Sequence, residues 1–134
     1  MYDSKQALTQ SNIKATMTDT SFQDQIDDAT LDFTLGNSQA AIDKLTTLAL
    51  EDSGIFGVWH ALTEIYFAEG DNEAALQSAE RAYSIDSEDI HINTSLSRIW
   101  VELGDKDKAE QFGAKARMLA WKDELKSSVE QDDI

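Results

Sequence analysis

The sequence contains no cysteine and no proline, and only 6 of its 134 residues are glycine. The absence of cysteine excludes disulfide bonds, thiolate metal sites and cysteine nucleophiles. Because proline is absent, no residue of this kind interrupts a helix. No apolar run approaches the ~20 residues that a membrane-spanning helix needs. The length fits one compact domain that can fold without disulfide bonds.

Positive charge is also scarce. The chain has 11 Lys and Arg against 26 Asp and Glu, which gives a formal net charge of −15. This balance disfavours nucleic acid and anionic membrane surfaces as partners, because both require cationic side chains. The acid excess fits adaptation to high salt, high solubility or a basic partner. The first 19 residues have no apolar block, so no secretory signal is predicted and the expected location is the cytoplasm.

Two markers recur at a fixed period of 34 residues. A glycine followed by Asn or Asp recurs at this spacing, and an alanine stands five residues after each glycine. Such a period indicates a repeat architecture. The units run over about 22–55, 56–89 and 90–123. The glycines are Gly36, Gly70 and Gly104, and the alanines are Ala41, Ala75 and Ala109.

Each unit is predicted to form two helices. In the middle unit, Trp59, Leu62 and Tyr66 fall on one helical face. Gly70 is expected to end that helix and Asp71 to cap the next one. Ser87 is expected to cap the first helix of the third unit. The last helix is predicted over about 106–126.

The ends of the chain carry fewer signals. Residues 1–20 are predicted to be a polar tail or a short helix, and residues 127–134 an acidic, solvated tail.

The middle unit resembles the tetratricopeptide repeat. Trp59-x-x-Leu62-Thr63-x-x-Tyr66, then Gly70-Asp71 and Ala75, match its 34-residue signature, although the closing proline is missing. The resemblance implies an all-α, right-handed α-solenoid of three helix-turn-helix units over residues 21–126, with an extended C-terminal helix. The residues expected to pack the helices together are Ala41, Trp59, Leu62, Tyr66, Ala75, Leu96, Trp100 and Ala109.

The resemblance also implies that the first helix of each unit lines a concave groove. Phe33, Phe67 and Val101 share one phase and are expected to form an apolar stripe across it. Such a stripe would seat a peptide or an amphipathic helix of a partner. The alternatives are that the N-terminal tail of the chain itself covers the stripe, or that its side chains pack in the core. The predicted groove residues are Ile26, Thr30, Phe33, His60, Glu64, Phe67, His91, Thr94, Arg98 and Val101.

The predicted function is therefore a non-catalytic adaptor or small chaperone that binds a protein partner. The sequence has no glycine-rich phosphate loop and no G-x-S-x-G motif, and neither an enzymatic activity nor a cofactor is predicted. One alternative is a homodimer formed through the last helix, with Phe112, Ala116, Leu119 and Ala120 on its outer face. A weaker one is a metal site at His60, Glu64 and His91.

Overall fold

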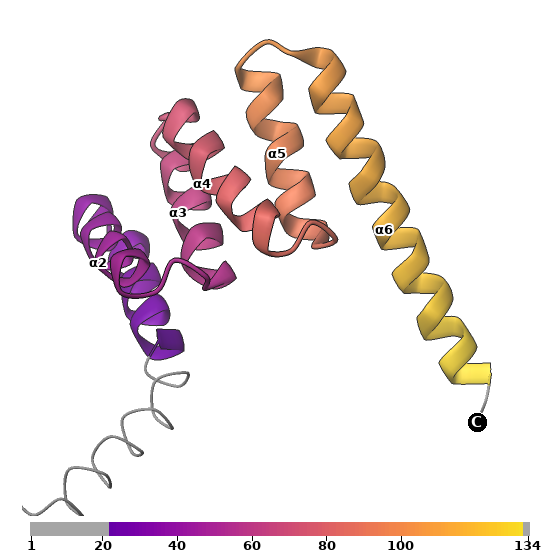
Figure 1. The fold of residues 1–134 in the computed structure, drawn as a ribbon, viewed down its shortest axis with the longest axis horizontal. Helices are drawn as coiled ribbons and strands as arrows, with labels where there is room; N and C mark the ends of the chain where they lie inside the picture. Colours follow the sequence, from indigo (N-terminus) through magenta and orange to yellow (C-terminus); the bar gives the residue numbers. More distant parts are fainter. Residues whose placement is uncertain (1–21, 133–134) are drawn as a thin grey trace, which may run out of the picture.

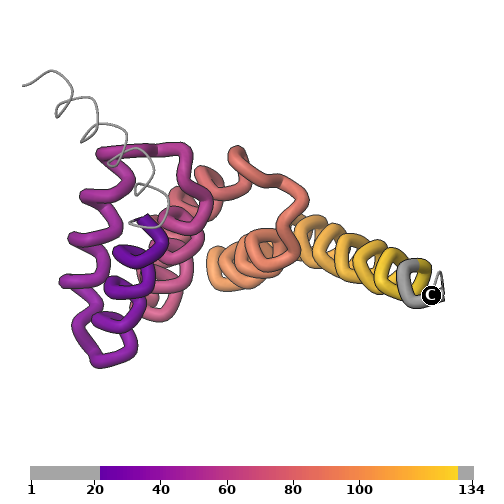
Figure 2. Tube along the Cα trace, turned by 90° about the horizontal axis from the view of Figure 1, so that it is seen from below, coloured from indigo at the N-terminus to yellow at the C-terminus, as the bar shows by residue number. Residues whose placement is uncertain are grey.

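The computed structural model describes residues 22–132, which form a row of helices with no strand in that range (Figure 1). A first helix covers residues 22–34. The helices that follow are α2 (Ser38–Glu51), α3 (Phe56–Ala68), α4 (Asn72–Ile85), α5 (Ile90–Glu102) and α6 (Lys106–Asp132). Paired in order, they give the three predicted helix-turn-helix units, which succeed one another along the molecule (Figure 2). The all-α repeat architecture is thus confirmed.

The turn inside each unit has the same geometry three times. Gly36, Gly70 and Gly104 have φ angles of 91°, 81° and 85°, a region that favours glycine because it has no Cβ. In the middle unit, the Gly70 N–H donates to the Phe67 carbonyl over 3.1 Å, and the Asp71 N–H donates to the Tyr66 carbonyl over 2.9 Å. These two bonds form a Schellman motif, which satisfies the last carbonyls of α3. Such a turn explains the 34-residue glycine period.

Aspartates cap the helices that follow two of these turns and one further helix. The Asp71 carboxylate accepts from the Ala74 N–H over 3.2 Å, as the sequence predicted. Asp105 accepts from the Lys108 N–H over 3.0 Å at the start of α6. The expectation that Ser87 caps α5 is wrong, because Asp89 is the N-cap.

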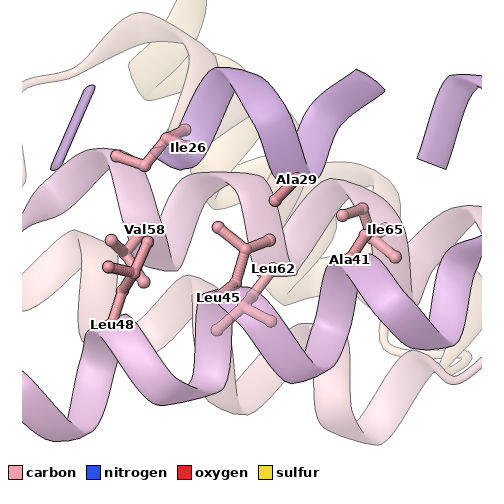
Figure 3. Packing of buried hydrophobic residues seen from close by; sticks show 8 residues of the cluster. All are labelled: Ile26, Ala29, Ala41, Leu45, Leu48, Val58, Leu62 and Ile65. Atoms are coloured by element: carbon pink, nitrogen blue, oxygen red, sulfur yellow. The ribbon is translucent and has the colours of Figure 1, made fainter. Parts of the chain in front are cut away.

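Two apolar clusters form the core. The first joins residues 22–34, α2 and α3 through eight buried side chains (Figure 3). The second joins α4 and α5 and has Phe112 of α6 packed against it. Ala41 and Ala75 are fully buried and Ala109 is 5% exposed, so their small side chains allow close helix approach. Leu62 and Leu96 are buried, whereas Trp59, Tyr66 and Trp100 remain half-buried.

An ion pair lies where the first unit departs from the repeat pattern. Asp28 stands in the phase of Leu62, and Asp32 in that of Tyr66. Lys44 of α2 contacts both carboxylates, at 2.7 Å from Asp28 and 2.5 Å from Asp32. These hydrogen bonds raise the pKa of Lys44 above its ordinary value of 10.5. At these two repeat positions the first unit therefore has charged side chains. The second unit has apolar side chains there, which face the unit before it.

The C-terminal helix is longer than the sequence predicted. The helix α6 continues to Asp132, so the boundary expected at residue 126 is wrong. Lys, Glu, Gln and Ser prevail after residue 121, and no proline or glycine follows Gly113 to end the helix. Side chains 121–129 are exposed, as expected for a solvated segment. The polar segment predicted over 1–20 lies outside the described residues.

Candidate functional site

Glu64 is the centre of a polar network between α3 and α5. Ser95 donates to the Glu64 carboxylate over 2.5 Å, and the Arg98 guanidinium lies 4.0 Å from its other oxygen. His60, one turn earlier on α3, places its Nε2 3.7 Å from the same carboxylate. The Glu64 side chain is still 41% exposed. A carboxylate held in one orientation, with its oxygens open to solvent, can accept hydrogen bonds from a ligand.

Three aromatic rings lie beside this network. The His60 and His91 rings stack with centroids 6.2 Å apart and an angle of 22° between their planes. The Phe56 ring lies 5.7 Å from His60 on the other side. This row connects the first turn of α3 to the first turn of α5, so it forms one end of the groove.

Arg98 covers the aromatic ring at the other end. Its guanidinium carbon lies 4.6 Å from the centroid of Phe67, a cation–π arrangement. Arg98 therefore contacts both the Glu64 carboxylate and the Phe67 ring. This double contact orders a long side chain that is itself exposed.

The predicted apolar stripe is only partly open. Phe33 packs against the first core cluster and Phe67 against the second, so both rings are half-buried. Val101 is 59% exposed and is the most exposed of the three. Much of the surface of Phe33 and Phe67 is thus used in core packing, which was the alternative to partner binding.

Ile26 corrects the predicted set. It is 8% exposed and lies in the first core cluster (Figure 3), so it does not face a groove. Thr30 and Thr94 are exposed, and each hydroxyl donates over 2.9 Å to the carbonyl four residues earlier. The groove surface is thus built from α3, α5 and one exposed threonine of the first helix.

The proposed metal site is wrong. His60 and His91 stack their rings face to face, an arrangement that does not direct ring nitrogens at one point. Within residues 22–132, no group of three His, Asp or Glu side chains is placed to share a metal ion.

The expected outer face of the last helix is also wrong. Phe112 packs edge-on against Tyr83 of α4 with centroids 5.7 Å apart, and Ala116 is 8% exposed. Leu119 and Ala120 are half-buried. Phe112 and Ala116 thus pack within the chain rather than on an outer face.

Two groove residues were missed by sequence reasoning. Ser95 is 6% exposed and holds Glu64 from the neighbouring helix, while Phe56 contacts His60. The two members of the Ser95–Glu64 pair lie 31 residues apart, close to the repeat period of 34. A search for polar pairs separated by nearly one period would have found it.

Known proteins share features of this sequence and fold. The tetratricopeptide repeat family model matches residues 66–120. No curated protein matches the sequence. Within the described residues, no helix is both long and apolar enough to cross a membrane.

Solved structures share the fold at low sequence identity. MamA, in one crystal structure, is 23% identical in sequence to this chain, and the two structures align with a TM-score of 0.65. The alignment covers 70% of this chain and 51% of the MamA chain. This chain therefore spans about half the length of that MamA chain. PcrH, in complex with the chaperone binding region of PopD, is 22% identical in sequence and aligns with a TM-score of 0.71. The alignment covers 76% of this chain and 77% of the PcrH chain.

The type III secretion translocator chaperone SycD of Yersinia enterocolitica is 17% identical with a TM-score of 0.72, covering 84% of this chain and 88% of its own. The resemblance seen in the sequence is thus confirmed: residues 66–120 match the tetratricopeptide repeat model, and the described helices have the fold of these helical-repeat structures.

Proposed function

We propose that this protein is a non-catalytic interaction module, an adaptor or small chaperone that holds a segment of a partner protein on the groove of α3 and α5. The observation that carries the proposal is the Glu64 network. Ser95 and Arg98 fix the carboxylate from α5 while the side chain stays 41% exposed. The groove thus offers an ordered and accessible carboxylate on α3 as a polar anchor and exposed Val101 on α5 as an apolar seat.

The chemistry of the groove selects the partner. Residues 22–105 contain 17 Asp and Glu but only three Lys and Arg. Such a surface attracts a cationic segment and repels an acidic one. We therefore expect an amphipathic helix or extended peptide with apolar side chains against Val101 and Phe67, and a Lys, Arg or backbone donor on Glu64.

The structural neighbours are compatible with this role. The PcrH structure is a complex with the chaperone binding region of PopD, and SycD is a secretion translocator chaperone. A similar fold in this chain supports binding of a partner segment, and the expected location remains the cytoplasm. The groove residues above, rather than the fold, determine which segment is bound.

An affinity pull-down from the source organism tests the proposal. Thr94→Arg/Val101→Asp changes two exposed groove positions, and Leu50→Asp changes an 84% exposed leucine of α2 as the control. We expect wild type and Leu50→Asp to capture the same protein and the double variant to lose it. Circular dichroism confirms that all three are folded. Equal capture by the groove variant would place binding elsewhere and overturn the proposal.

A further inference from the structure

Two pockets occupy equivalent positions between successive units. One lies among α2, α3 and α4 and has a volume of about 600 Å³. The other lies among α4, α5 and α6 and has a volume of about 210 Å³. All six residues lining the smaller pocket stand 34 positions after residues lining the larger one. The first inter-unit pocket is thus an enlarged copy of the second.

Substitutions between the copies explain the enlargement. The smaller pocket is filled by Tyr83 and Phe112, whose rings pack edge to face. The larger pocket has Ala49 in the phase of Tyr83 and Ser78 in that of Phe112. Two aromatic rings are therefore missing from a site that still has aromatic walls. Its volume and its lining suit an aromatic side chain from outside.

Trp59 forms one of the walls of the larger pocket. Its ring is half-buried, and the Arg81 guanidinium carbon lies 5.2 Å from the ring centroid. Arg81 stands in the phase of Lys115, which hydrogen-bonds the hydroxyl of Tyr83, a residue that lines the second pocket. In the first pocket, Arg81 has no aromatic ring to contact in the position of Tyr83, because Ala49 stands there. The cation that accompanies the missing aromatic side chain is therefore still present.

An exposed apolar stripe lies on the projecting part of α6. Met118, Trp121, Leu125 and Val129 are 56%, 60%, 46% and 60% exposed. Their spacings of three or four residues place them on one helical face, over a length of about 17 Å. Figure 1 shows this end of α6 extending beyond α5. Four large apolar side chains in one row mark an interaction surface.

The distribution of charge favours contact between the α6 stripe and the large pocket of another copy. Six of the 11 Lys and Arg of the chain lie on α6, where they balance six Asp and Glu. Residues 22–105, which contain the large pocket, have a 17-to-3 excess of acids over bases. Two acidic bodies repel each other, whereas the neutral α6, with Lys122 and Lys126 beside the stripe, does not repel an acidic body.

We infer that the stripe of one copy docks in the α2–α4 pocket of a second copy, with Trp121 as the aromatic side chain that enters it. The contact is head to tail, because the two surfaces differ. It uses a face of α3 other than the groove, as Trp59 and Tyr66 line the pocket while His60 and Glu64 line the groove. Partner binding and self-association are therefore separable.

Sedimentation velocity of the full chain at about 1 to 200 μM tests the inference. Trp121→Ala/Leu125→Ala removes the stripe at exposed positions, and Ala49→Tyr restores the ring that the second pocket has. Gln77→Trp, at an exposed position of α4, blocks the same pocket without entering the core. We expect concentration-dependent assembly of wild type, and roughly 30-fold weaker association for each variant alone.

Mixing the variants provides the decisive result. The stripe variant retains its pocket and Ala49→Tyr retains its stripe, so an equimolar mixture should form a single 1:1 pair and nothing larger. A wild type that stays monomeric at 200 μM would overturn the inference. Undiminished assembly of both pocket variants, with loss only in the stripe variant, would also overturn it, because this pattern indicates pairing of α6 with α6. Thermal unfolding of each variant confirms that it is folded.

Discussion

Lys115 on α6 donates a hydrogen bond to the Tyr83 hydroxyl on α4 over 2.8 Å, and its ammonium lies 4.7 Å from the centroid of the Tyr83 ring. The contact connects the second helices of two successive units. In a helical repeat, each unit is stabilised mainly by its neighbours. This pair is therefore part of what holds the third unit onto the second.

Tyr83→Phe removes the hydroxyl and keeps the ring. We expect the free energy of unfolding to fall by about 0.5–1.5 kcal/mol, the usual net value of one hydrogen bond. Urea denaturation measures this loss. Lys115→Met should make the further loss from Tyr83→Phe much smaller, because the hydroxyl then has no donor to lose. Equal losses in both backgrounds would show that the two residues are not coupled.

Ala75→Leu tests the close approach of α3 and α4. Ala75 is fully buried, so the three heavy atoms that leucine adds have no free space, and the substitution should cost about 1–3 kcal/mol. The control is Ala68→Leu at an exposed position of α3, which should change stability by less than about 0.5 kcal/mol. Similar melting temperatures for the two variants would contradict the packing described for Ala75.

Asp71 and Asn37 occupy the same phase of the repeat but differ in capping. The Asp71 side chain accepts from the Ala74 N–H, whereas Asn37 makes no side-chain capping bond at the start of α2. Asp71→Ala should therefore cost about 0.5–2 kcal/mol, and Asn37→Ala clearly less. Chemical denaturation of the two variants side by side measures the difference. A larger loss in Asn37→Ala would be inconsistent with the capping pattern.

The repeat itself was predictable because glycine and alanine mark its backbone geometry. Gly70 is required by the positive φ of the turn, and Ala75 by the helix contact five residues later. Both demands recur in every unit, so they leave a period in the sequence. The period indicates the repeat, and the resemblance to the tetratricopeptide repeat then implies the fold class.

The site was less predictable because side-chain burial depends on contacts between units. Phe33 and Phe67 have the phase of a groove residue, yet each ring folds back onto a core cluster. Ile26 takes a core position because its side chain lies against α3, near Gly57. The large pocket at Ala49 becomes visible only when the two inter-unit contacts are compared in three dimensions.

The Lys44 ion pair predicts a pH dependence at the alkaline end. The carboxylates of Asp28 and Asp32 raise the pKa of Lys44 in the folded state above 10.5. A raised pKa adds stability that is fully present below the unfolded value and is lost as the pH rises through the folded value. Lys44→Met should therefore be less stable than wild type at pH 7, and the gap should narrow above about pH 10.5.

Lys122→Met provides the matched control for this titration, since Lys122 is an exposed lysine of α6. Its difference from wild type should not change over the same pH range. Urea midpoints measured at pH 7, 9 and 11 give the comparison. A gap for Lys44→Met that stays constant to pH 11 would show that the ion pair does not stabilise the folded chain.

We propose that a partner protein occupies the groove of α3 and α5. Site-specific photo-crosslinking in the source cells tests it most directly, with a photoreactive phenylalanine analogue at Thr94 or Val101, and at Leu50 as the off-groove control. All three positions are exposed. We expect one common adduct from Thr94 and Val101 that is missing from Leu50. No adduct from either groove position, or the same adduct from all three, would contradict it.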